Sequence, residues 1–294
     1  MPRRVSGRRR QDRRQACHAV TRVPELPEVE AERRRLEPVI AGKRFERVIV
    51  RRPDLRAPFP PKFSARLHGQ TALAVRRRAK YLLVPLSSGE TLLMHLGMSG
   101  SFRVDRHRRK PDPGRHDHVM FEMSFGTSVT FTDPRRFGFM DLVSEDALAM
   151  HPVLSTLGPE PLSAEFDASA LARACRGRKT PLKIALLDQR VVAGLGNIYA
   201  SEALHLARLS PHRQASTIAT ASGAPRESAR RLAAAIKQVL AEAVERLSQA
   251  VYRSARFRVY DREAARCRRA GCGGTIRRRT QAGRSTFFCP VCQR

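Results

Sequence analysis

Short hydrophobic runs dominate the chain from Gly42 to about residue 143. They are rich in Val, Ile, Phe, Leu and Met, and turn-forming sequences such as SSGE, GMSG and SFGTS separate them. Runs of this length between such breaks are typical of strands joined by turns. The pattern predicts an antiparallel β-sandwich or barrel. Its expected strands are FERVIVRR, TALAVRR, KYLLVPL, TLLMHL, HVMFEM, SVTFT and FGFMDLV.

A helical periodicity precedes and follows this strand region. Before it, the apolar positions from Val29 to Ile40 lie near helical spacing, Pro27 suits a first helical turn, and Gly42 follows as a stop. After about residue 155 the apolar positions again recur at helical spacing. We therefore expect a leading helix and a second, helical domain. Its helices are predicted near residues 163–176, 181–189, 197–207 and 225–250.

Four of the six cysteines lie in a small, basic segment at the end of the sequence. Cys267 and Cys272 are separated by four residues, Cys289 and Cys292 by two, and the sixteen residues between the pairs suffice for a β-hairpin. Four thiolates brought together in this way make a closed tetrahedral zinc site, which lets a segment without a sizeable core fold. Two disulfides in a secreted domain are the alternative, disfavoured because we find no secretory signal. We expect one structural Zn²⁺, with Cys17 and Cys175 outside it.

The charge balance points to a polyanionic partner. The chain has 56 Lys and Arg against 27 Asp and Glu, a formal charge of +29, and nucleic acid is the leading candidate. Residues 1–22 hold eight Arg and one Asp, and the rest of the chain still carries a formal charge of +22 without them. The excess of positive charge therefore belongs to residues 23–294. Because no run approaches the roughly 18 apolar residues of a membrane span, we expect a cytoplasmic protein without a membrane partner. Cations between the two cysteine pairs are expected to contact phosphate: Arg277, Arg278, Arg279 and Arg284.

Motifs spread over nearly everything from residue 23 onward add a family resemblance. PELPEVE, RRAKYLL, HLGMSG, HDHV, TDPRRFG, LGPEPL, GLGNIYASEAL and GRSTFFCPVCQR occur in this order, and together they resemble bacterial formamidopyrimidine-DNA glycosylase. The resemblance implies a base-excision-repair enzyme that removes oxidised purines, formamidopyrimidine and 8-oxoguanine, from double-stranded DNA and cleaves abasic sites by β,δ-elimination. It also implies a bacterial, nucleoid-associated monomer. The pyrimidine-specific sister group, endonuclease VIII, typically has Gly where Leu26 stands, which favours the purine branch.

Pattern and resemblance together imply an α+β multidomain fold. It comprises an N-terminal β-sandwich with a leading helix, a helix-two-turn-helix domain and a C-terminal zinc-finger β-hairpin. The expected division is a disordered extension at 1–23, the catalytic domain at 24–155, the helical DNA-binding domain at 156–252 and the zinc module at 253–294.

The resemblance assigns the chemistry to the PELPE stretch. Pro24 would be the nucleophile, because a terminal proline is a secondary amine and α-amino groups have pKa values near 7.7 to 8.0, well below the roughly 10.4 of lysine. Glu25 would be the acid that assists sugar-ring opening, and Glu28 a carboxylate that orients the amine or shuttles protons. The resemblance implies that Lys80 takes part in β-elimination and phosphate contact, and that Arg284 takes part in δ-elimination. Taken alone, without the other motifs, PELPE favours the interpretation of a helix N-terminus with capping acids.

The resemblance also implies which residues bind the DNA. Met98, Arg135 and Phe137 would form the wedge that fills the stack when the damaged base is flipped out. Asn197, at a helix N-terminus, would contact backbone phosphate. The other candidate phosphate binders are His95, His116, Arg136, Arg178, Lys179 and Lys183.

Two features depart from the family pattern. The sequence following the long helix, AVERLSQAVYRSARFRVYDREAARC, leaves out most of the segment that covers flipped 8-oxoguanine, so we expect formamidopyrimidines and abasic sites to be processed better than 8-oxoguanine. The second departure is the extension before Pro24, because an internal proline nitrogen is a tertiary amide and cannot form an iminium. We expect Val23 to be the true start, read as initiator methionine. If the extension is retained, the chain would instead be a lesion-binding protein without lyase activity; an oxidised-pyrimidine glycosylase is the alternative enzyme.

Overall fold

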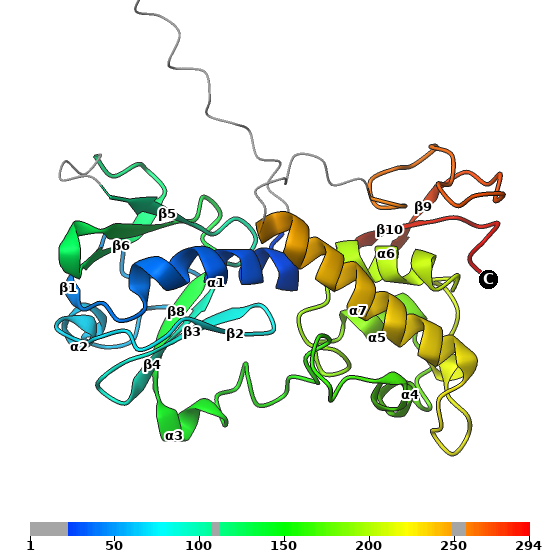
Figure 1. Ribbon diagram of the computed structural model, residues 1–294, viewed down its shortest axis with the longest axis horizontal. Coiled ribbons are helices and arrows are strands. Elements are labelled where there is room, and N and C mark those ends of the chain that lie inside the picture. Colours follow the sequence, from blue (N-terminus) through cyan, green and yellow to red (C-terminus); the bar gives the residue numbers. More distant parts are fainter. Residues whose placement is uncertain (1–22, 107–111, 249–256) are drawn as a thin grey trace, which may run out of the picture.

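The computed structural model describes residues 23–106, 112–248 and 257–294. The predicted disordered extension, apart from Val23, lies outside the described residues, as does the centre of the shortened connection near residue 250. Within the described parts, a β-rich half and a helical half are joined end to end, and the zinc hairpin sits against the helical half (Figure 1).

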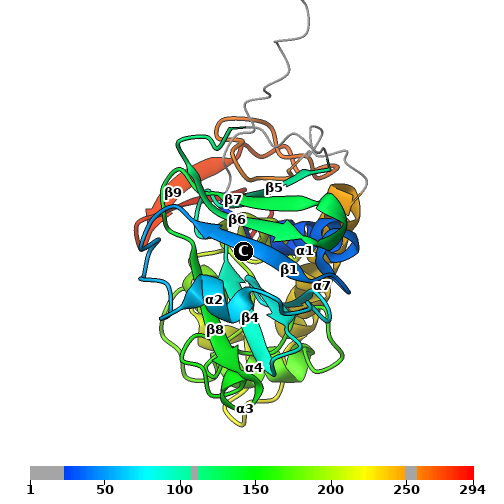
Figure 2. The same ribbon diagram turned by 90° about the vertical axis from the view of Figure 1, so that its left-hand side faces the viewer.

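Two four-stranded antiparallel sheets form the N-terminal half, with strand orders β1-β6-β7-β5 and β2-β3-β4-β8. Figure 2 shows them as stacked layers. Alternate side chains of both sheets, such as Phe121, Phe131, Leu92 and Met140, point into one shared apolar core. The expected sandwich is therefore present. Its strands are β1 (Phe45–Val50), β2 (Arg76–Arg78), β3 (Tyr81–Pro85), β4 (Glu90–His95), β5 (Ser101–Asp105), β6 (Asp117–Met123), β7 (Ser128–Thr132) and β8 (Phe139–Ser144).

The leading helix α1 (Leu26–Ile40) begins where the sequence predicts, with Pro27 in its first turn. Its apolar stripe, including Val29 and Leu36, packs into the sandwich core. The helix also contacts α7 of the second half, so it spans the junction between the two halves (Figure 1). Gly42, at a φ of +74°, turns the chain away after the helix ends.

Some local structure of this half differs from expectation. The predicted strand TALAVRR overlaps β2 only at Arg76 and Arg77; before them Leu73 is 58% exposed, and Thr71 and Ala72 form only isolated bridges. Strand β5 was not anticipated, since SFRVD offers only two apolar positions. The remaining short elements are α2 (Phe63–Leu67), η1 (Ser124–Gly126) and α3 (Glu145–Leu148).

The helical half is built around α6, which is buried along nearly its whole length. The long helix α7 lays an apolar face across it, with Leu232, Ile236 and Leu240 fully buried. All four predicted helices are present, with shorter bounds than the periodicity suggested. The elements of this half are α4 (Ala168–Cys175), α5 (Leu182–Leu187), α6 (Asn197–Leu206), η2 (Ala215–Ile218) and α7 (Glu227–Ser248).

The C-terminal module is a hairpin of β9 (Arg277–Gln281) and β10 (Arg284–Phe288). Its own core is small, consisting of Val259, Ile276, Phe287 and Cys289, so it depends on other contacts for stability. The combination of sandwich, helical half and hairpin confirms the predicted fold class. Among the described residues, no helix is both long and apolar enough to span a bilayer.

Candidate active site and metal centre

Glu25 lies at the meeting point of the two halves. It directly precedes α1, is 3% exposed, and its carboxylate accepts hydrogen bonds from the backbone N–H groups of Ile198 (2.8 Å) and Tyr199 (3.4 Å) in the first turn of α6. The N-terminus of a helix has unpaired N–H groups and a partial positive charge, which suit a carboxylate. The backbone N–H of Leu26 adds a bond to Gly194 O at 3.0 Å. The PELPE stretch is therefore docked on the loop that starts α6.

Glycines in the GLGN loop make this approach feasible. A Cβ on Gly196 would lie 2.3 Å from Glu25 Cδ, and one on Gly194 would lie 2.8 Å from Leu26 Cδ1. Gly194 also has a φ of +81°, which other residues rarely adopt. The two glycines that belong to the sequence motif are thus needed for backbone-to-side-chain contact between domains.

Glu28 shares the same buried environment. One carboxylate oxygen accepts the N–H of Glu25 at 3.1 Å, and the other accepts the hydroxyl of Tyr199 at 2.7 Å. Burial, reinforced by the charge of Glu25, raises the pKa of Glu28 to about 7. Burial also raises the pKa of Glu25, although the ammonium of Lys80 opposes this. A pKa of about 7 lets Glu28 hold a proton near neutral pH, and the pKa of Glu25 is shifted in the same direction, which suits acid catalysis.

Lys80 enters the site from the sandwich. It occupies the tight turn between β2 and β3, and its ammonium donates to Leu195 O at 3.1 Å. Burial lowers its pKa; the charges of Glu25 and Glu28 oppose this shift, while Arg284 adds to it. Glu160 fixes the turn itself, because it accepts the N–H of Ala79 and pairs with the guanidinium groups of Arg77 and Arg78 on β2.

Arg284 and Pro24 border this buried group. Arg284 begins β10, is exposed, and its charge acts on Lys80 and Lys183. The half-buried Pro24 directly precedes Glu25, whose N–H is held by the carboxylate of Glu28. The structure thus gathers the five expected catalytic residues around the start of α6.

The expected wedge residues lie on two neighbouring loops. Met98 follows β4, whereas Arg135 and the 41% exposed Phe137 precede β8, with the Arg135 guanidinium 4.9 Å from the centre of the Phe137 ring. A buried carboxylate, Asp133, joins the loops, because it accepts the hydroxyl of Ser99 and the N–H of Gly138 (2.8 Å).

Several expected phosphate binders have other partners in this structure. Lys183 is fully buried and donates to Ser285 O (3.0 Å) and Thr286 Oγ1 (2.8 Å), so it holds the β9–β10 hairpin instead of facing solvent. Asn197 also donates to Ser285 O at 3.0 Å, from its side-chain nitrogen. Arg178 pairs with Asp188 at 2.9 Å. These contacts support the hairpin and the loop before α6.

The remaining candidates divide between packing and exposure. His95 is largely buried between Tyr81 and Phe139, and burial lowers its pKa to about 4, so it is neutral at physiological pH. Its Nδ1 accepts the N–H of Gly97 at 3.0 Å and thereby shapes the Met98 loop. His116 is half-buried. Two cations face solvent: Arg136 and Lys179.

The four cysteines of the hairpin module converge. The sulfur atoms of Cys267, Cys272, Cys289 and Cys292 lie within 4.8 Å of one another, as four ligands of one tetrahedral ion must. Four thiolates without an open position make a structural and not a catalytic zinc centre. The arrangement is consistent with one Zn²⁺, as the spacing predicts. Cys175 is buried within the helical core and unconnected to this group.

Sequence reasoning missed the residues that organise the site without being part of its chemistry. Tyr199 bonds the expected Glu28, and Ser99 bonds the backbone N–H of the expected Arg135. Asp133 and Glu160 act less directly, because they hold the loops that carry the wedge residues and Lys80. Each lies inside or beside one of the motifs, which is the only signal that would have indicated them.

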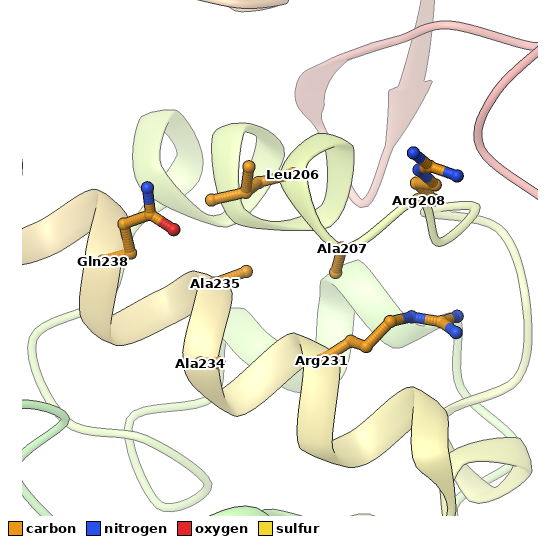
Figure 3. A pocket seen from close by; sticks show the side chains of 7 residues that line it. All are labelled: Leu206, Ala207, Arg208, Arg231, Ala234, Ala235 and Gln238. Carbon is orange, nitrogen blue, oxygen red and sulfur yellow. The ribbon is translucent and has the colours of Figure 1, made fainter.

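A surface groove lies away from these residues. It measures about 290 Å³, and Figure 3 shows it between the C-terminal end of α6 and the side of α7. Exposed Arg208, Arg231 and Gln238 border it, and none of the expected site residues contributes to its lining.

Comparisons with known proteins agree with this architecture. The family model "Formamidopyrimidine-DNA glycosylase N-terminal domain" matches residues 23–140, "Formamidopyrimidine-DNA glycosylase H2TH domain" matches 157–254, and "Zinc finger found in FPG and IleRS" matches 266–294. The chain belongs to the formamidopyrimidine-DNA glycosylase family. The predicted enzyme class, a base-excision DNA glycosylase, is that of this family, for which lyase activity is typical.

Relatives of this family match the chain over most of its length. It is 54% identical to the formamidopyrimidine-DNA glycosylase of Rhodopseudomonas palustris (strain BisA53), covering 92% of this chain and 100% of the relative. The Lactococcus lactis enzyme bound to abasic-site DNA has a TM-score of 0.81 at 31% identity, covering 92% and 99%. Its complex with FAPY-dG-containing DNA has a TM-score of 0.81 at 30% identity, covering 92% and 100%.

The coverage of the R. palustris alignment indicates that this chain is shorter than the relative within the matched region. The matched 92% of 294 residues is about 270 residues, whereas the R. palustris alignment extends over 293, about 23 more. Only eight residues separate Ser248, the end of α7, from Phe257. The shortening that the sequence predicts at this connection stays a prediction.

Proposed function

We propose that this chain excises oxidised purines from double-stranded DNA and cleaves the resulting abasic site through an iminium on Pro24. The observation that carries the proposal is the group of buried Glu25 and half-buried Glu28 and Lys80 beside Pro24, at the junction of the two halves. The relatives bound to abasic and FAPY-dG DNA support the same substrate class.

The chemistry assigns one step to each group. The Pro24 amine attacks C1′ as the glycosidic bond breaks and the base departs with the bonding electrons and a proton. Glu25, whose pKa is raised by burial, donates a proton to the ring oxygen as the C1′–O4′ bond breaks. The nitrogen loses its proton and supplies the electron pair that forms the C1′=N bond of the iminium. Removal of a C2′ proton then expels the 3′-phosphate. A second elimination, for which Arg284 is positioned at the hairpin, expels the 5′-phosphate, and water releases the sugar fragment.

This mechanism requires a free nitrogen on Pro24. A peptide bond from Val23 would delocalise the lone pair and prevent attack. The family model begins to match at residue 23, which supports Val23 as the initiator position. Removal of an initiator methionine at position 23 would expose the secondary amine of Pro24.

Borohydride trapping on abasic DNA tests this requirement. Protein made with Val23 as initiator methionine is expected to form a covalent adduct that peptide mapping locates to Pro24, and the full 294-residue chain none. Intact mass must verify each N-terminus. An adduct from the full chain with its extension intact would refute the role of Pro24. Lesion binding without any adduct from either form would favour the non-catalytic alternative.

DNA contacts and assembly complete the proposal. Met98, Arg135 and Phe137 fill the space left by the flipped base, while the arginines of the hairpin and exposed cations such as Lys179 hold phosphates. The modules 24–155, 156–252 and 253–294 act as one monomer on the DNA of the nucleoid, in the cytoplasm.

Substrate preference follows from the short connection after α7. Because a covering segment would be reduced there, ring-opened formamidopyrimidines and abasic sites are processed better than 8-oxoguanine. Single-turnover rates on matched duplexes test this, and equal or faster cleavage of 8-oxoguanine would contradict it. An oxidised-pyrimidine duplex in the same panel distinguishes the sister activity.

A further inference from the structure

The zinc module is attached to the C-terminal end of α6. The backbone N–H of Ser210 donates to Arg294 O at 3.1 Å, and the Gln293 side chain donates to Leu209 O at 3.0 Å. Two longer side chains, His205 and Arg269, make the same connection beside the metal ligands themselves. We refer to them as the docking pair.

His205, in the last turn of α6, reaches the ligand cluster. It is 2% exposed, and its Nε2 lies 3.3 Å from Cys267 Sγ and 3.7 Å from Cys292 Sγ. A thiolate bound to zinc has no hydrogen and can only accept. The hydrogen of the neutral imidazole must therefore reside on Nε2 for this contact to be favourable.

The other ring nitrogen of His205 indicates why a histidine, and not an apolar ring, occupies this position. Nδ1 of His205 is buried and has no hydrogen-bond partner within the described parts of the chain. A buried polar atom left unpaired costs roughly 1–3 kcal/mol. If the ring served only to fill space, Phe would do so without that penalty. The gain must come from Nε2.

Arg269 contacts the same turn from the other side. It lies within the four-residue gap between Cys267 and Cys272, and its guanidinium donates to His205 O at 2.9 Å and to Leu206 O at 3.3 Å. These carbonyls belong to the end of α6, where the helix leaves acceptors unpaired and concentrates negative partial charge. The longer gap in the first cysteine pair is what supplies this arginine.

We propose that the docking pair couples zinc ligation to α6: His205 donates to the zinc-bound thiolates of Cys267 and Cys292, and Arg269 caps the helix that carries His205. Both are positioning residues and neither is a ligand. Because the opposite end of α6 receives the Glu25 carboxylate, the pair sets the metal module, and the Arg284 hairpin with it, relative to the acid. Outer contacts of this kind typically change metal affinity by about 10- to 100-fold.

Two substitutions at one position separate the hydrogen bond from packing. In the Zn²⁺-loaded full chain, His205→Phe keeps a ring but removes the donor, whereas His205→Gln keeps an N–H donor but removes the ring. Competition with a chromophoric chelator measures zinc affinity. We expect a loss of about 10- to 100-fold for Phe and a clearly smaller loss for Gln. Unchanged or tighter zinc binding by the Phe variant would overturn the proposal.

Arg269→Ala tests the second contact, with Arg231→Ala as its matched control. Arg231 is an exposed arginine on α7 that borders the groove at the same end of α6 (Figure 3). We expect faster zinc release only from the Arg269 variant. Equal release rates in both variants and the parent protein would remove Arg269 from the docking pair.

A measurement without substitution covers the case in which a variant fails to fold. When NMR-active cadmium replaces zinc in the parent protein, a hydrogen bond to a ligating sulfur transmits scalar coupling between the metal and the donated proton. We expect such coupling to the Nε2 proton of His205. Absence of that coupling while backbone donors in the module show it, or direct ligation of the metal by Nε2, would overturn the proposal.

Discussion

Replacing Ser99 by Ala should loosen the wedge that replaces the flipped base. The Ser99 hydroxyl donates to the buried carboxylate of Asp133 and accepts the N–H of Arg135 at 3.1 Å. It is therefore a bridge between the loop of Met98 and the loop of Arg135 and Phe137. Removing one oxygen breaks both bonds while the loops keep every wedge side chain.

The size of the effect follows from the kind of bonds removed. A hydrogen bond to a charged group contributes about 1.5–3 kcal/mol, and a bond to an exposed backbone N–H contributes less. Asp133 keeps the N–H of Gly138, which limits the loss. We expect about 2 kcal/mol, which corresponds to about a 30-fold lower kcat/KM on duplex DNA if the wedge must be formed in the transition state for base flipping.

Comparing cleavage rates on duplex and on single-stranded abasic DNA distinguishes misplaced wedge loops from a general loss of enzyme activity. A single strand has no paired partner to be displaced, so the Ser99→Ala enzyme should be impaired on the duplex and near normal on the single strand. Ser101→Ala, at an exposed position two residues away, is the control. Equal losses on both substrates would refute the reasoning, as would an unaltered rate on the duplex. Under the proposed mechanism, both the variant and its control must be made with a free Pro24 amine.

Three further results are expected. The folded-state pKa of Glu28, about 7, is above its ordinary 4.5, so the stability that the protonated carboxyl contributes is complete below pH 4.5 and is lost as the pH rises through 7. Glu28→Gln cannot lose a proton, so its melting temperature should rise relative to that of the parent protein between pH 5 and 8. A constant difference between the two melting temperatures would argue against the raised pKa. Gly196→Ala, whose Cβ would lie 2.3 Å from Glu25 Cδ, should lower stability by about 1–3 kcal/mol in thermal unfolding and reduce borohydride trapping. Gly114→Ala, where the nearest atom is 3.5 Å away, is its control and should be neutral. Finally, Arg279→Ala should reduce the slope of log affinity against log salt by about 1 in a binding titration, and an unchanged slope would exclude a phosphate contact.

The sequence predicts the architecture well where periodicity is strong. The helix α1, the strands β3 and β4 and the long α7 all follow from apolar spacing, and the zinc cluster follows from cysteine spacing alone. Strand β5 could not be anticipated, because its half-buried residues are mostly polar and its pairing with β7 is set by the rest of the sheet.

The motifs name candidate members of the site, whereas its geometry does not follow from the sequence. The motifs name Glu25, Lys80 and Asn197, which come from distant segments, and only the fold brings Glu25 to the start of α6. Lys183 illustrates what charge alone cannot predict: a lysine in a basic segment suggests phosphate, whereas its surroundings are Ser285 and Thr286 of the hairpin. Burial decides between these outcomes, and burial is a property of the packed tertiary structure.

The short connection after α7 need not disturb the zinc module, because the module is held from inside the helical half. Glu202, on α6 and 2% exposed, accepts the backbone N–H groups of Arg258 (2.7 Å), Val259 (2.8 Å) and Tyr260 (2.9 Å). Three bonds to one buried carboxylate fix where the chain returns after the connection, whatever its length. In the proposed mechanism, covering of the flipped base and support of the Arg284 hairpin are thus separate tasks. We expect that losing the first alters which lesion is preferred, whereas strand cleavage through Pro24 and Arg284 remains.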